Sequence, residues 1–279
     1  MDKISKLFIY LVLIAFAAIM VLPFIWMLSA SLRQPQDLYT SGVKLLPVDQ
    51  ATGKISATLN NYREVMTQLP FGRMFLNSLF VAVVATVFNL FFNALAAYAF
   101  ARINFPFKEK IFSFMLASLM IPFYVVMIPL VFITKNLGMY DSLWGLIIPV
   151  SMSVYNVFLI RQFIIGIPIE LEEAATLDGC SRFRIFWSII LPLSKPVLAV
   201  VGIFTFMFNW NNFTWPLVLI ISRNNFTLPL GLGALMTQSG SKYHLLLAGA
   251  TITIVPMVII FLVMQKYIIK GITMGAVKG

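Results

Sequence analysis

A short acidic stretch interrupts an otherwise apolar sequence between Ile167 and Gly179. Pro168 suits a first helical turn, and the glutamates that follow it stand where the helix dipole favours anions. Two alanines then give high helix propensity, and Gly179 is a typical helix end. The order predicts a helix of two or three turns. Six residues are expected to form a docking surface on it, in which carboxylates meet basic partner residues and alanines allow close approach: Glu172, Glu173, Ala174, Ala175, Asp178 and Gly179.

The alternative is an amphipathic helix that only rests at the membrane interface. The residues that follow support either reading. They offer a second apolar face before two prolines break the chain, and this face consists of Phe183, Phe186, Trp187 and Ile190. We treat residues 165–195 as one cytoplasmic loop.

Amides and aromatic rings cluster elsewhere, between Asn209 and Trp215. Amides hydrogen-bond hydroxyl groups, and aromatic faces pack on sugar C–H surfaces without requiring charge. Asn89 and Asn93 are four residues apart and so share one helix face. We expect some of these residues to line a path for a neutral solute; the alternatives are amides that join helices and an interfacial aromatic belt. The candidates are Asn209, Trp210, Asn211, Asn212, Trp215, Asn89 and Asn93.

Several kinds of chemistry are disfavoured by what the sequence lacks. There is no G-x-x-x-x-G-K-[ST] segment, so the chain does not itself bind nucleotide phosphates. Its long apolar runs hold almost no ionisable residues, which disfavours an ion-coupled carrier or a membrane enzyme. A single cysteine, Cys180, excludes an intramolecular disulfide and a multi-cysteine metal site, and no catalytic or metal-binding residues are predicted. The net charge of +10 is ascribed to loops beside anionic lipid, not to nucleic acid.

The elements that position these residues are long apolar runs in a chain of 279 residues that is 60% hydrophobic and 11% charged. Crossing a hydrocarbon core of about 30 Å takes about 20 helical residues. Backbone groups in lipid must be satisfied internally, so such runs are expected to be helices. The prediction is a single all-α integral membrane domain, 1–279, with six spans at about 7–28, 74–100, 111–134, 143–160, 197–221 and 245–264. Prolines within the third, fourth, fifth and sixth of these spans predict kinks.

The distribution of Lys and Arg predicts the orientation, because cytoplasmic loops carry more of them. With the N-terminus inside, the larger share of the 20 Lys and Arg residues is cytoplasmic. Both termini are therefore expected in the cytoplasm, with an extracytoplasmic loop of little regular structure over 33–73. The first run exceeds the length of a signal-peptide core, so it is expected to be a retained anchor.

The acidic loop resembles that of binding-protein-dependent ABC importer permeases, whose pattern is E-A-A, three residues, G, nine residues, I-x-L-P. The matching positions are Glu173, Ala174, Ala175, Gly179, Ile189, Leu191 and Pro192. The resemblance implies that the short helix is a coupling helix seated on a cytosolic ATPase subunit, that Leu191 and Pro192 belong to the same site, and that ATPase motion passes to the spans as a rigid-body movement.

Further patterns resemble the carbohydrate-importing permeases of the maltose and oligosaccharide type. They are Phe206, Trp210-Asn211, Phe213 and Pro216-Leu217, the exit of the second span at 96–102, Asn77-Ser78, and the tail Lys270–Gly279. This likeness implies the smaller of two permease partners in a sugar importer of the bacterial inner (plasma) membrane.

The implied partners are a second homologous permease, two cytosolic ATPase subunits that bind ATP and Mg, an extracytoplasmic solute-binding protein and membrane lipid. The alternatives are a permease for a non-sugar solute and an ion-coupled secondary carrier.

Overall fold

The computed structural model describes residues 3–40, 45–49, 52–238 and 242–276. The chain divides into two compact units. Unit 1 holds Met1–Gly72 and Gly231–Pro256, and unit 2 holds Arg73–Leu230 and Met257–Gly279. The last residues of the expected C-terminal tail, 277–279, lie outside the described residues.

Unit 1 begins with α1 (Lys3–Ser31), whose buried residues are confined to its last turn. Before that turn the helix is apolar all round and largely exposed, which suits a lipid environment. The following segment holds more structure than expected, with α2 (Pro35–Thr40), α3 (Asn60–Gln68) and an isolated antiparallel bridge between Val48 and Ile55. Part of α14 (Leu228–Gln238) and of α15 (Tyr243–Ala276) also belongs to this unit.

Buried polar contacts stabilise the regular structure of that segment. Its composition, which is typical of a loop, did not indicate them. The Asn61 amide donates to the carbonyls of Ser31 (2.8 Å) and Arg33 (2.7 Å), and the hydroxyls of Ser31 and Tyr62 lie 2.6 Å apart. Burial lowers the pKa of Arg33, which nearby Asp37 opposes. These contacts tie α3 to the end of α1.

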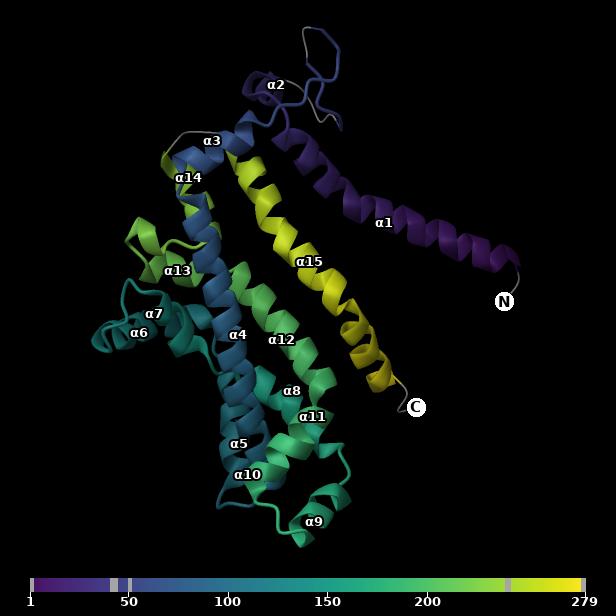
Figure 1. The fold of residues 1–279 in the computed structure, drawn as a ribbon, viewed down its shortest axis with the longest axis vertical. Helices are drawn as coiled ribbons and strands as arrows, with labels where there is room; N and C mark the ends of the chain where they lie inside the picture. The colour runs from purple at the N-terminus through teal and green to yellow at the C-terminus, as the bar shows by residue number, and fades with distance from the viewer. Residues whose placement is uncertain (1–2, 41–44, 50–51, 239–241, 277–279) are drawn as a thin grey trace. The chain divides into compact units, whose positions relative to one another are not determined.

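Unit 2 is built around α4 (Phe71–Arg102), a long continuous helix (Figure 1). Two buried clusters pack on it, one around Val81, Trp215 and Leu219 and the other around Ala97, Ile160 and Phe186. The remaining helical segments are α5 (Lys108–Ser118), α6 (Phe123–Asn136), α7 (Leu143–Ile147), η1 (Ile148–Val150), α8 (Val154–Ile165), α9 (Glu170–Leu177), α10 (Arg182–Ile185), η2 (Phe186–Ile190), α11 (Leu191–Leu193), α12 (Lys195–Trp210), α13 (Thr214–Leu219) and η3 (Arg223–Asn225).

Among the described residues, three helices are long and apolar enough to cross a membrane: Lys3–Ser31, Phe71–Arg102 and Tyr243–Val263. Three further candidates are bent helix pairs, α5 with α6 (103°), α7–η1 with α8 (48°) and α10–α11 with α12 (77°). By length and composition, the part of the chain that the structure describes thus offers up to six crossings.

Prolines explain where the expected spans break. A proline in a helix clashes with the carbonyl four residues earlier and leaves it without a donor. Pro122 acts on Ser118, where α5 ends. Pro149 frees the carbonyl of Gly145, which accepts the indole N–H of Trp215 at 3.2 Å. A neighbouring helix therefore satisfies the freed carbonyl, as a membrane requires.

The fifth expected span is not one helix over 197–221, because α12 ends at Trp210 and α13 starts at Thr214. A continuous helix would set the Pro216 ring against the Asn212 carbonyl. The asparagine side chains also compete for backbone groups. The Asn211 amide donates to the Met207 carbonyl (2.9 Å), and the Asn212 side chain accepts the N–H of Trp215 (3.2 Å).

Gly145→Ala is expected to destabilise unit 2. A Cβ there would clash with the backbone oxygen of Met139 and lie 2.8 Å from Leu219 Cδ2. Overpacking of this kind costs about 1–3 kcal/mol, measurable as a lower melting temperature in detergent. The matched control is Gly72→Ala, where a Cβ meets nothing within 4 Å. Equal melting temperatures for the two variants would contradict the packing described here.

Candidate functional site

The predicted short helix is present as α9, eight residues from Glu170 to Leu177. Glu170, Glu172 and Glu173 occupy its first turn, where the helix dipole favours them. Gly179 follows the helix with φ +76°, a left-handed conformation that favours glycine. The N–H groups of Gly179 and Cys180 close the end by donating to the carbonyls of Thr176 (3.0 Å) and Ala175 (2.9 Å).

The two sides of α9 have different surroundings. Glu173, Ala174, Asp178 and Gly179 are exposed, and Leu177, which the sequence reasoning did not single out, has 90% of its surface exposed.

Glu172 and Ala175 face inward, one helical turn apart. Glu172 is 2% exposed and Ala175 packs in the cluster around Ile160. The Glu172 carboxylate meets a basic residue of this same chain, because its Oε1 lies 2.7 Å from Arg102 Nε at the end of α4. The expected docking surface is therefore narrower than the sequence indicated, and two of its six residues lie beneath it.

The segment after α9 packs partly in the core and is partly exposed. Phe186 and Ile190 are buried, whereas Phe183 and Trp187 are exposed, so the four do not form one free face. Phe186–Ile190 form a π-helical turn. Leu191 packs partly against the core and Pro192 is exposed.

Asn89 and Asn93 do not lie on an open surface. Asn89 Oδ1 accepts the amide of Asn156 at 2.7 Å, and the same amide donates to the Thr205 hydroxyl at 3.1 Å. Asn93 Oδ1 accepts the N–H of Ser153 at 3.0 Å, at the start of α8. Both asparagines are buried, and their contacts join α4 to α8 and α12. This geometry favours the alternative reading of these two residues as amides that join helices.

Substitution of Asn89 by Leu is expected to lower stability and leave solute affinity unchanged. The change removes one of the two acceptors of the Asn156 amide, and interhelical hydrogen bonds of this kind contribute about 0.6–1.7 kcal/mol. The melting temperature and the KM of uptake, measured on the same preparation, separate the two roles. A raised KM at an unchanged melting temperature would place Asn89 on the solute path.

The predicted solute-path residues at the end of α12 also differ in their exposure. Trp210 is fully buried and stacks on Phe206 with ring centroids 5.8 Å apart, and Trp215 is 1% exposed. Asn209 is half-buried and donates to the carbonyl of Thr205 at 2.8 Å. Asn211 is exposed and Asn212 half-exposed, both in the break between α12 and α13. These two amides are the candidates that remain accessible.

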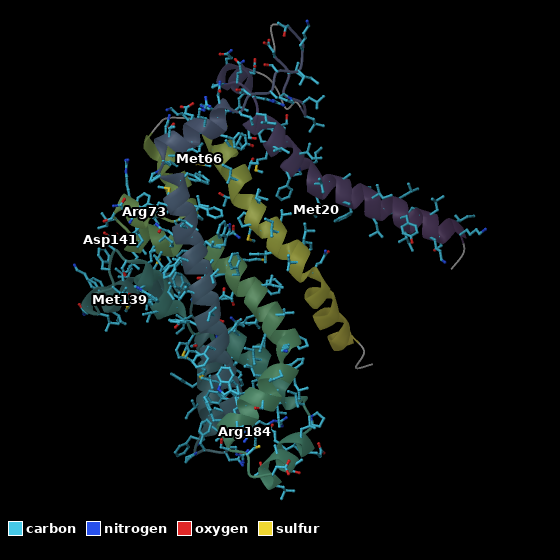
Figure 2. All side chains as sticks on the ribbon, in the orientation of Figure 1. Met20, Met66, Arg73, Met139, Asp141 and Arg184 are labelled. Carbon is cyan, nitrogen blue, oxygen red and sulfur yellow. The ribbon has the colours of Figure 1, made fainter. Side chains whose placement is uncertain are left out.

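At the other end of α4, polar side chains hold the loop at 222–228. Arg73 Nε and the Asn77 amide donate to the Asn224 carbonyl at 2.9 and 2.8 Å. The carboxylate of Asp141 accepts the N–H groups of Ile221 and Ser222 at 3.0 and 2.9 Å. Figure 2 shows Arg73 and Asp141 toward one end of α4 and Arg184 toward the other.

Burial alone would raise the pKa of Asp141, but the hydrogen bonds it accepts from Ser222 and Ile221 outweigh this and lower it. Sequence reasoning did not single out Asp141, because nothing local marks a lone aspartate in a turn.

The described residues contain no group of three or more His, Cys, Asp or Glu placed to hold a metal ion. At one end of unit 2, α9 presents a small exposed surface with acidic residues and Leu177, and the α12–α13 break presents two amides.

The chain is similar to known proteins over most of its length. Residues 93–274 match the family described as binding-protein-dependent transport system inner membrane component. The chain is 38% identical over 281 residues to the arabinooligosaccharides transport system permease protein AraQ of Halalkalibacterium halodurans, with 99% of each chain covered. It is 41% identical over 207 residues, 74% of each chain, to the protein of the same name from Bacillus subtilis.

The fold resembles, with a TM-score of 0.81 and 26% identity, a chain of a bacterial ABC transporter involved in the import of the acidic polysaccharide alginate. The match covers 95% of this chain and 97% of that one. The predicted all-α permease architecture and the prediction of a transport subunit in place of an enzyme are confirmed. The chain belongs to the inner membrane components of binding-protein-dependent transport systems and is a permease subunit of an ABC importer.

Proposed function

We propose that this subunit forms half of a path for an oligosaccharide across a bacterial inner membrane and receives its energy through α9. The relatives' names support the solute class, since they refer to arabinooligosaccharides and to alginate. The complex would comprise this chain, a second homologous permease, two cytosolic ATPase subunits that bind ATP and Mg, and an extracytoplasmic solute-binding protein. Both termini would lie in the cytoplasm.

The observation that carries the proposal is the form of α9. It is short, it ends at a left-handed glycine, and its outward side combines exposed Leu177 with Glu173 and Asp178. Such a surface suits a cleft that is apolar at its base and basic at its rim. The ATPase subunit is the expected occupant, because the chain has no phosphate-binding segment of its own.

The break between α12 and α13 supports the second part of the proposal, the solute path. Irregular backbone at membrane depth is tolerated where it is covered by protein or lines a water-filled cavity. Residues 211–213 form such a break inside an apolar stretch, and Asn211 is exposed there. Amides without charge suit hydroxyl-rich solutes. Asn211 and Asn212 are therefore proposed to contact the solute, and Asn209 to hold the end of α12.

The test is uptake of labelled arabino-oligosaccharide by the whole complex in proteoliposomes that contain ATP, with ion gradients collapsed by ionophores. We expect uptake that requires ATP and the solute-binding protein and is competed by unlabelled oligosaccharide. Uptake that survives ATP removal but not ionophores would identify an ion-coupled carrier. If only non-sugar solutes competed, the chain would still be an importer permease, but the assignment of a carbohydrate as its solute would be wrong.

A further inference from the structure

One arginine at the end of α4 holds three helical elements together. The Arg102 guanidinium donates through Nη2 to the carbonyls of Ile164 (2.8 Å) and Ile167, the last turn of α8 and the connection that follows it. Its Nε lies 2.7 Å from Glu172 Oε1 on α9. A single side chain therefore contacts α8, the α8–α9 connection and α9.

The junction is buried, although it lies at the end of a long membrane helix. The side chains of Arg102 and Glu172 are 10% and 2% exposed, and the Tyr98 hydroxyl donates to the second carboxylate oxygen at 3.3 Å. An arginine that only anchored α4 at the lipid surface would direct its charge outward. Here the charge is directed at the protein's own carbonyls and carboxylate.

A buried ion pair is weak evidence for stability, because well-packed apolar residues often replace one without loss. Its better-attested use is to select one arrangement of the elements it joins. That use fits α9, since only two of its eight residues, Glu172 and Ala175, are buried. Without the pair, Ala175 is the one buried residue of α9 that still packs on the core of unit 2.

We propose that Arg102 is the positioning residue that makes α9 move as one body with the ends of α4 and α8, so that displacement of α9 by a partner reaches the membrane helices. The contact that carries this is the Arg102–Glu172 pair together with the two carbonyls on the same guanidinium. The inference rests on the proposed docking role of α9, and it removes Glu172 from the docking surface.

A matched control is available in Arg161. It also lies at this end of unit 2, where its Nε donates to the Phe100 carbonyl at 3.1 Å and its Nη2 lies 3.3 Å from Glu109 Oε1. Arg161 thus joins α8 to α4 and α5 with a comparable set of bonds, and none of its described contacts is with α9.

The test uses the intact complex and three variants. Arg102→Met combined with Glu172→Gln removes the pair without leaving a buried charge unpaired. Arg102→Lys keeps a cationic donor, and Arg161→Met is the control. We expect the double variant to retain its ATPase subunits and ATP hydrolysis but to carry at least ten-fold less solute per ATP, whereas Arg102→Lys and Arg161→Met stay within about three-fold of the unmodified complex.

A distance measurement separates positioning from a general loss of structure. Spin labels at Asn104→Cys and Glu170→Cys, both exposed, are placed in a Cys180→Ser background. We expect one narrow distance distribution with and without ATP and vanadate in the unmodified complex, and a nucleotide-dependent or broadened one in the double variant. Normal solute carried per ATP in the double variant, or an unchanged narrow distribution, would overturn the inference. Failure of the docking role itself would show differently, as normal uptake by Gly179→Arg.

Discussion

Gly179→Arg is expected to abolish ATP-driven uptake while the chain still inserts and folds. A Cβ at this position meets nothing within 4 Å, so the new side chain projects into the space where a partner would sit. Its φ of +76° adds strain for any residue with a Cβ, about 1–2 kcal/mol. Uptake in vesicles and retention of the ATPase subunits during purification measure the effect, and both should fall to background.

Gly138→Arg is the matched control for that variant. Gly138 also has a left-handed φ, +70°, and open space around its Cβ, but it lies in the turn between α6 and α7. It therefore carries the same backbone strain away from α9, and uptake should persist. The pair Glu173→Lys and Asp178→Lys tests the same surface through charge alone. Equal uptake by the Gly179 and Gly138 variants would contradict the proposed docking role of α9.

The second large effect is expected at the break between α12 and α13. Asn212 caps α13 through the N–H of Trp215, so it is best changed to serine, which keeps a cap while removing the amide. Asn211→Ala combined with Asn212→Ser should raise the KM of solute uptake about five- to 150-fold, as expected for losing two hydrogen bonds of about 0.5–1.5 kcal/mol each. Retention of the ATPase subunits should not change.

Asn212→Ser alone serves as the structural control, since it preserves the helix start and loses one of the two amides. Its KM should lie between those of the unmodified complex and the double variant. An unchanged KM in the double variant would mean that the solute contacts the partner permease in place of these residues.

Local patterns predicted α9 because every signal for it is local. Glutamates, alanines and a terminal glycine specify a helix within a dozen residues, and Gly179 does adopt the left-handed conformation expected of such a stop. Proline likewise marked the kinks in the third and fourth spans. Pro216 marked a kink in the fifth span as well, but the full break at 211–213 was not predicted, because mean apolarity over 197–221 outweighs two asparagines in a search for spans.

The burial of Glu172 could not be predicted from the sequence, because its partner Arg102 is 70 positions away along the chain. The same holds for Asn89, whose partners Asn156 and Thr205 lie on two other helices. The types and the spacing of Glu172 and Asn89 marked them as candidates for a functional site. Only the packing distinguishes an amide that joins helices from one that faces a solute.

The most direct test of energy entry through α9 is a cross-link from Leu177 in the intact, transporting complex. A photoreactive group on Leu177→Cys, with Cys180 changed to serine, should capture a subunit whose sequence contains G-x-x-x-x-G-K-[ST]. The same group on Gly138→Cys should not. Capture of lipid alone from Leu177, in a complex that still imports solute on ATP, would contradict the account.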